Sequence, residues 1–179
     1  MAIIRYTKEE NIRYAYLNIF PDQFKTIKPV DKSVQMYLIF LMLEHNLEVN
    51  KSGINAIINS NGMAYINEDL QLKILNYYRH IEQLASREEI TNSDIKLMYE
   101  PYVKANYPWI YNRTNPWPRQ TEFYINDPRP VASIDEKSLL SDKQLEVMIF
   151  GRRFQSMRLR SLYSNTIALA EEIIADIEN

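Results

Sequence analysis

His45 and His80 are the only histidines in the sequence, and their surroundings argue against a metal site. Zinc and di-iron sites need three or four converging histidine or carboxylate ligands, and di-iron helical bundles supply them from paired Glu-x-x-His motifs. The sequence has no Glu-x-x-His motif and no cysteine. It therefore predicts no metal and no cofactor, and it predicts two partly exposed histidines on helices.

Nucleophilic and phosphate chemistry also lack their usual motifs. A serine hydrolase of the common type carries Gly-x-Ser-x-Gly, and phosphate loops are rich in glycine. The chain has three glycines and neither motif. Carboxylate pairs such as Glu88-Glu89 and Glu171-Glu172 are typical of solvated helix faces. The sequence favours a non-catalytic protein, and a carboxylate-dependent hydrolase is the enzymatic alternative. A buried carboxylate pair facing a deep pocket would favour that alternative.

Four arginines in the stretch GRRFQSMRLR form the one concentration of positive charge: Arg152, Arg153, Arg158 and Arg160. Helical spacing spreads them over more than one face, which favours local pairing with acidic helices. The alternative is a docking site for an anionic ligand or partner at Arg152 and Arg153. The net charge of −2 predicts no general attraction to nucleic acid.

Residues 107–135, the proline-rich segment, hold both tryptophans and five of the eight prolines. This composition forbids a continuous helix, and it predicts a long irregular excursion from the bundle. We interpret the segment as a candidate recognition surface. Trp117 is its best anchor, because Pro116 and Pro118 hold it in extended backbone. The remaining candidates are Trp109, Arg113 and Arg119. The alternative is that the tryptophans cover the end of the bundle.

The elements that position these residues are predicted to be helices. Scarce glycine and apolar residues at steps of three and four predict an all-α bundle of four to six helices in a single domain, residues 1–179. The expected helices cover residues 8–20, 31–47, 52–58, 67–84, a further stretch capped by Thr91 or Asn92, and 141–178. Tyrosines such as Tyr102 and Tyr107 are expected to wall the core with their hydroxyls reaching water, rather than line a ligand pocket.

Local signals refine this bundle. Asn67 is a predicted N-cap, Ser52 is predicted to cap the short helix, and Gly62 is expected to take a positive φ as a helix stop. The apolar run 36–43 predicts a central buried helix, with Phe40 and Leu41 packed against the helices carrying Ile74 and Phe154. The closing helix is predicted to bury one stripe, which includes Leu145, Met148, Phe154, Met157, Leu162, Leu169, Ile173 and Ile177.

Three stretches resemble a family of uncharacterised bacterial membrane proteins, of Bacteroidetes type, that carry one N-terminal span and an extracytoplasmic helical domain. They are residues 50–67, residues 70–78, and Leu139-Leu140-Ser141-Asp142 opening the closing helix. The resemblance covers roughly residues 33–179 and implies a helical fold on the periplasmic side. The family's span is missing here, because the longest apolar run has eight residues against the roughly 20 that a span needs. We expect either a shortened membrane-anchored chain or a relative in the cytoplasm.

Together these patterns predict a non-catalytic binding or sensory module that contacts a protein partner, and they leave a homo-oligomer open. The alternative is a structural or assembly subunit of a membrane complex, which a large apolar patch on the last helix would favour. An exposed apolar groove would favour the binding module.

Overall fold

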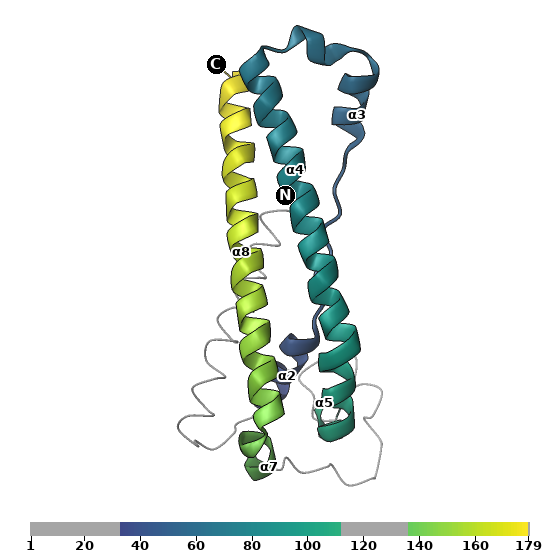
Figure 1. The fold of residues 1–179 in the computed structure, drawn as a ribbon, viewed down its shortest axis with the longest axis vertical. Coiled ribbons are helices and arrows are strands. Elements are labelled where there is room, and N and C mark those ends of the chain that lie inside the picture. Colours follow the sequence, from purple (N-terminus) through teal and green to yellow (C-terminus); the bar gives the residue numbers. More distant parts are fainter. Residues whose placement is uncertain (1–32, 112–135, 179) are drawn as a thin grey trace, which may run out of the picture.

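The computed structural model of the chain describes residues 33–111 and 136–178, and every regular element in these ranges is helical (Figure 1). In chain order they are α2 (Ser33–Met42), α3 (Ser52–Asn59), a 3-10 helix (Gly62–Tyr65), α4 (Glu68–Asp94), a π-helix (Ile95–Tyr99), α5 (Glu100–Asn106), a second 3-10 helix (Pro108–Tyr111), α7 (Glu136–Ser141) and α8 (Lys143–Glu178). The predicted all-α bundle is confirmed. The expected helix over 8–20 and most of the proline-rich segment lie outside the described residues.

Two long helices, α4 and α8, run antiparallel side by side and give the molecule its elongated shape (Figure 1). With 36 residues, α8 is about 54 Å long. The N-terminus of α4 is fixed as predicted, since the Asn67 side chain accepts a hydrogen bond from the Leu70 N–H at 2.8 Å. Glu68 and Asp69 follow in the first turn, where the helix dipole favours negative charge.

The predicted helix start at Thr91 or Asn92 is wrong, because α4 continues through both residues. The Thr91 hydroxyl donates to the Arg87 carbonyl within the helix, at 2.9 Å, instead of capping a new one. The π-helix and α5 then extend α4 without a break, and Pro101 lies in the first turn of α5, directly after the π-helix. A continuous helical rod therefore replaces two predicted helices.

The π-helix changes which residues of this rod face the core. Before it, the buried positions Ile81, Leu84, Glu88, Thr91 and Ile95 follow alternating steps of three and four. Continued unchanged, that pattern would bury position 98, but Met98 is 49% exposed and the buried residues are Tyr99 and Val103. A π-helix accommodates an extra residue, and here it moves the buried face one position along the sequence.

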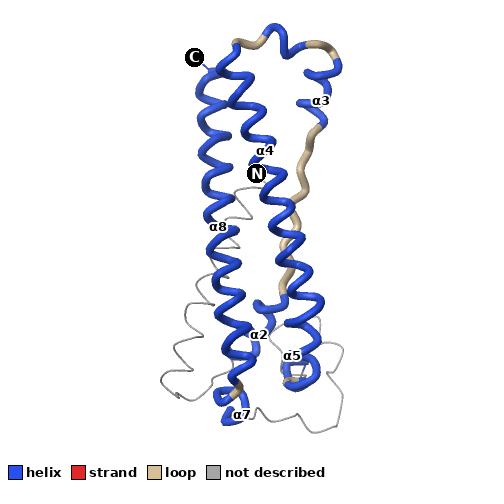
Figure 2. Tube along the Cα trace, viewed as in Figure 1, coloured by secondary structure: helices blue, strands red, loops and turns tan. Residues whose placement is uncertain are grey.

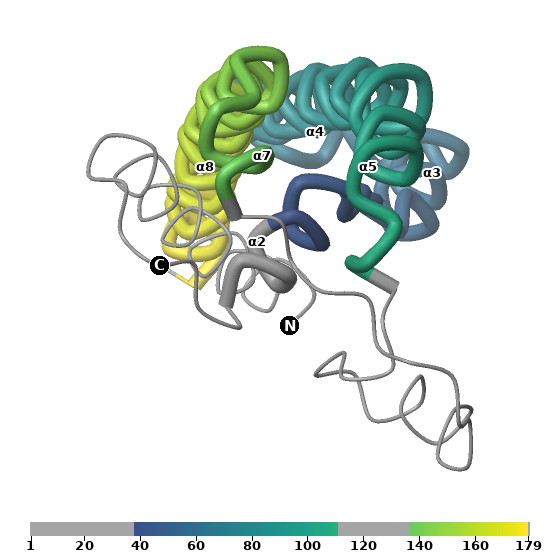
Figure 3. Tube along the Cα trace, turned by 90° about the horizontal axis from the view of Figure 1, so that it is seen from below, coloured from purple at the N-terminus to yellow at the C-terminus, as the bar shows by residue number. Residues whose placement is uncertain are grey.

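The hydrophobic core lies at one end of the rod, where α4, α5, α7 and α8 curve around α2 (Figure 3). Leu38 and Leu41 of α2 are fully buried, which confirms α2 as a central helix. Phe40 is only half-buried. Leu41 packs with the helix that carries Phe154, as predicted, since its cluster includes Leu145 and Ile149 of α8. Phe154 itself is 61% exposed, so its assignment to the buried stripe of α8 is wrong. The core is completed by Ile95, Tyr99, Val103, Tyr107, Trp109, Ile110, Leu139, Leu145, Met148 and Ile149.

The helix expected over 31–47 ends early, at Met42. Residues 43–51, the extended segment, leave α2 and run without regular structure along α4 as far as α3 (Figure 2). The backbone groups of such a segment need partners outside a helix. Side chains of α4 and α8 supply them, as described for the candidate site below.

The turn after α3 corrects two expectations. Gly62 begins the 3-10 helix with no positive φ, and the left-handed residue is Asn61, with φ of 56°. Asparagine tolerates this conformation just beyond a helix end. Glycine at position 62 fits a tight space, since a Cβ there would lie 3.1 Å from the Ile57 carbonyl oxygen. Ser52 is the first residue of α3 rather than its cap, and its N–H and hydroxyl donate to the Asn50 side chain.

Candidate functional site

The extended segment is held against α4 by side chains that take the place of a neighbouring strand. The Asn92 amide accepts from the His45 N–H at 2.8 Å and donates to the His45 carbonyl at 2.5 Å. The Asn92 side chain can make both bonds because its amide group carries a donor and an acceptor. Two residues further along, the Leu47 N–H donates to the Glu88 carboxylate at 2.7 Å. The segment thus has a fixed register on α4.

Arg152 fastens the same segment from α8. Its Nη2 donates to the Leu43 carbonyl at 2.8 Å and lies 2.6 Å from His45 Nε2. A guanidinium only donates, so Nε2 must accept, and His45 is the neutral tautomer with its proton on Nδ1. The expectation for His45 is wrong, because it is buried and lies in the extended segment rather than on a helix. His80 is half-buried on α4. Arg152 is fully buried and has no surface to offer a docking anion.

Glu88 joins three parts of the fold. It is buried, and its two carboxylate oxygens accept from the Leu47 N–H and from the Tyr163 hydroxyl of α8. A surface cavity of about 680 Å³ lies beside it, between the extended segment and α4, with Glu44, Glu89 and Lys96 in its lining. Glu89 is exposed, and Lys96 pairs with Glu44 at 3.0 Å. Among the carboxylates that line the cavity, Glu88 is the buried, hydrogen-bonded one, and Glu44, Glu48 and Glu89 are half-buried or exposed.

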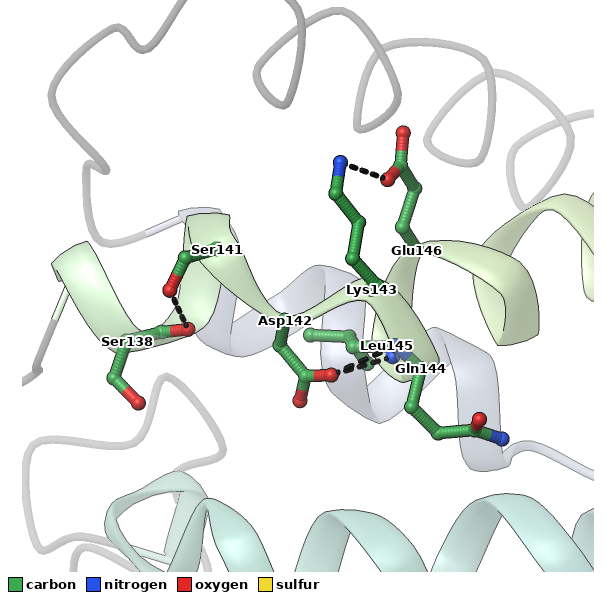
Figure 4. Close-up of polar contacts among 7 residues, drawn as sticks. All are labelled: Ser138, Ser141, Asp142, Lys143, Gln144, Leu145 and Glu146. Carbon is green, nitrogen blue, oxygen red and sulfur yellow. Dashed lines mark hydrogen bonds and ion pairs between the residues drawn. The ribbon is translucent and has the colours of Figure 1, made fainter.

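Asp142 organises the junction between α7 and α8 (Figure 4). As the N-cap of α8, its side chain accepts from the Gln144 and Leu145 N–H groups at 2.9 and 3.0 Å. Its other oxygen accepts from the hydroxyls of Tyr102, at 2.7 Å, and Tyr107. These two tyrosines line the core as predicted, and their hydroxyls bind Asp142.

Hydrogen bonding sets the charge state of this junction. Burial alone would raise the pKa of Asp142, but the bonds from Tyr107, the Leu145 N–H, Tyr102 and the Gln144 N–H outweigh it and lower the pKa. Burial and the bond to the Asp142 carboxylate raise the pKa of Tyr102 to about 12. The junction is therefore built around an ionised aspartate and neutral tyrosines at neutral pH.

We expect Asp142→Asn to destabilise the protein at pH 7 and to have a smaller effect at pH 3. A carboxyl whose pKa is lower in the folded state stabilises the fold above its unfolded pKa, near 3.9, and this contribution is lost as the pH falls through the folded value. Urea denaturation of both proteins at pH 7, 5 and 3 measures the difference in unfolding free energy. Ser141→Ala, at the neighbouring exposed position, is the control and should show no such trend. A difference that stays constant over this range would contradict the assignment.

The outer face of α8 carries a second candidate site. Val147, Phe150, Phe154 and Met157, the outer stripe, are 65, 41, 61 and 45% exposed. Their steps of three, four and three place them on one face, as in a coiled-coil seam. At about 100° per residue, this face lies opposite the one formed by the buried residues Leu145, Ile149, Arg152, Ser156, Leu159 and Tyr163. The first half of α8 is thus apolar on two opposite sides.

Arginines border the outer stripe. Arg153 is half-buried and Arg158 is exposed, one on each side of it. Neither has a hydrogen-bond or ion-pair partner in the part of the chain that the structure describes. The predicted pairing of these arginines with acidic helices is therefore not seen there for Arg153 or Arg158.

Of the two tryptophan candidates, the structure describes only Trp109. Trp109 is buried at the end of the core, with its ring edge-on to Tyr107 at a centroid distance of 6.1 Å, and so takes the covering role. Trp117, Arg113 and Arg119 lie outside the described residues, and their recognition role stays a prediction.

Sequence reasoning missed the outer stripe because it assigned Phe154 and Met157 to the buried stripe of α8. The signal was present, since Phe154 lies nine residues after Leu145 and nine steps of about 100° return to the opposite side of a helix. The roles of Glu88 and Asn92 were also missed, because their partners are set by the tertiary fold. Asp142 has local partners at Gln144 and Leu145, and only its bonds to the two tyrosines depend on the tertiary fold.

Among the described residues, no three His, Asp or Glu side chains gather to hold a metal ion, and no helix is long and apolar enough to cross a membrane. Comparison with protein-family models, curated proteins and solved structures found no match.

Proposed function

We propose that this chain is a non-catalytic interaction module that presents the outer stripe of α8 to a partner protein. The observation that carries the proposal is the exposure of four large apolar side chains in seam spacing, on the side of α8 turned away from the core. A helix that is apolar on both sides is usually covered on both sides.

The chemistry of the stripe suits a protein contact. Contiguous exposed apolar patches are uncommon on monomeric proteins and commonly mark interaction sites. Anchors at i, i+3 and i+7 match helix-in-groove recognition, in which a second helix lays its apolar face along the first. Aromatic side chains such as Phe150 and Phe154 contribute large contact areas. The family resemblance supports placing this module on the periplasmic side of a bacterial membrane.

Assembly with further copies of the chain is the second candidate. The apolar patch on the last helix is the feature that favours a structural or assembly subunit, and an outer stripe could meet its own copy. The two candidates differ in the mass of the complex.

Photo-crosslinking in cells that express the chain tests the proposal. A benzophenone amino acid replaces Phe154 in one variant and Leu97 in another, because Leu97 is an equally apolar, 75% exposed side chain of the π-helix. We expect a discrete adduct from position 154 and none from position 97. An added Phe150→Ser change should abolish the adduct while leaving stability within about 1 kcal/mol, as surface changes usually do.

The outcomes separate the candidates. An adduct of twice the chain's mass would favour the assembly subunit, and an adduct of another mass would favour the interaction module. No adduct at position 154, or equal adducts at both positions, would overturn the proposal.

A further inference from the structure

We infer that the partner of the outer stripe is an amphipathic helix whose apolar seam is bordered by acidic residues. This inference rests on the proposed function and adds the chemistry of the partner. It comes from the charges on both borders of the stripe rather than from the apolar residues themselves.

In a coiled-coil arrangement, the residues that border the seam meet the bordering residues of the other helix. With Val147 and Phe154 at equivalent seam positions, Arg153 and Arg160 fall on one border and Arg158 on the other. Glu146 is the acidic residue of these borders, and Lys143 already pairs with it at 3.0 Å. The outer stripe is thus bordered by positive charge on both sides.

The positive charges of two bordering arginines support an acidic partner. Arg153 and Arg158 have no ion-pair partner among the residues that the structure describes. Guanidinium groups form strong, often two-pronged hydrogen bonds with carboxylates. Glutamates on the borders of a docking helix would meet them at the rim of the contact, where charge complementarity favours the right partner and speeds association.

A second copy of the chain matches these positive borders less well than an acidic helix does. In parallel pairing, Arg153 of one copy would face Arg158 of the other across the seam. In antiparallel pairing centred on the stripe, the two Arg153 side chains would meet each other. Opposed like charges disfavour association, so the charge pattern selects an acidic helix over self-pairing.

An anionic membrane surface would also attract arginines beside an apolar face. The spacing of the stripe favours a helix, because steps of three, four and three form the holes that another helix fills. The experiment below therefore includes vesicles, which distinguish membrane binding from binding to a helix.

Two synthetic peptide helices of about 20 residues test the inference, with identical leucine seams and either glutamate or lysine on both borders. Binding of each labelled peptide to the full chain is measured by fluorescence anisotropy. We expect the glutamate peptide to bind at least about tenfold more tightly, since that ratio corresponds to about 1.4 kcal/mol of charge complementarity. The preference should shrink as salt rises from about 0.05 to 0.5 M.

Variants test which residues cause the tighter binding of the glutamate peptide. Arg153→Ala combined with Arg158→Ala should remove most of it, whereas Phe154→Ser should weaken both peptides. Arg79→Ala, at an exposed arginine of α4 that bonds Asn76, is the matched control and should change neither. Circular dichroism of each variant verifies that it folds.

Equal binding of the two peptides, or a preference that survives the double arginine change, would overturn the inference. Stronger binding to anionic than to neutral vesicles, lost in the double arginine variant, would replace it with a membrane surface. If the inference fails while the position-154 crosslink persists, the interaction module stands and only the partner's chemistry is wrong. If the crosslink is also absent, the proposed function fails.

Discussion

Leu41→Ala is expected to lower the free energy of unfolding by about 2–5 kcal/mol, the range seen when a fully buried leucine is truncated. Leu41 is completely buried in α2, inside the cluster that also holds Ile95, Val103 and Leu145. Because α4, α5, α7 and α8 form an arc over one side of α2, closing the resulting cavity would require several helices to move together (Figure 3). Urea denaturation monitored by circular dichroism measures the change.

Phe154→Ala is the contrasting variant, since it removes a larger side chain from the outer stripe. It should leave the unfolding free energy within about 1 kcal/mol of the parent, because surface changes seldom do more. Similar losses for both variants would show that the outer stripe belongs to the core. No loss for Leu41→Ala would show that α2 is not central.

Glu88→Ala is expected to destabilise the protein by about 2–6 kcal/mol, because two donors lose their acceptor at roughly 1–3 kcal/mol each. The donors are the Leu47 N–H and the Tyr163 hydroxyl, and they belong to the extended segment and α8. Denaturation midpoints give the overall loss. Faster proteolysis within residues 43–51 should accompany it, since the segment then keeps fewer bonds to α4.

Glu89→Ala is the matched control, with the same chemistry one residue further along α4 and an exposed side chain. It should change the unfolding free energy by less than about 0.5 kcal/mol. Tyr163→Phe removes one of the two hydroxyl and N–H donors to Glu88. Its loss of unfolding free energy should lie between those of Glu88→Ala and Glu89→Ala. Equal effects of the changes at positions 88 and 89 would refute the structural role of Glu88.

The parts of the fold that sequence reasoning predicted depend on neighbours along the chain. Asn67 caps α4 through a residue three positions away. The burial of Leu41 followed from a run too apolar to face water. These signals act within a few residues, so they can be read without knowing the fold.

The parts that were missed depend on distant partners. His45 was placed on a helix, yet its backbone is bound by Asn92, 47 residues away, and its ring lies against Arg152, 107 residues away. Local propensity favoured helix there, and side chains from two other helices outweighed it. Phe154 was misplaced for another reason, since the predicted stripe merged two opposite apolar faces of α8 that the helical period separates.

The π-helix carries a consequence for the length of the chain. Counted in residues, it amounts to a single insertion between the core positions Ile95 and Val103. A gene that lost one codon here would convert the stretch to ordinary α-helix, and Tyr99 and Val103 would then stand three and seven residues after Ile95, which keeps them on the core face. A gene that gained a second extra codon would instead turn everything after it by about 100° and move Val103 and Tyr107 off the core. Between positions 95 and 99, a one-residue deletion should therefore be tolerated more readily than a one-residue insertion.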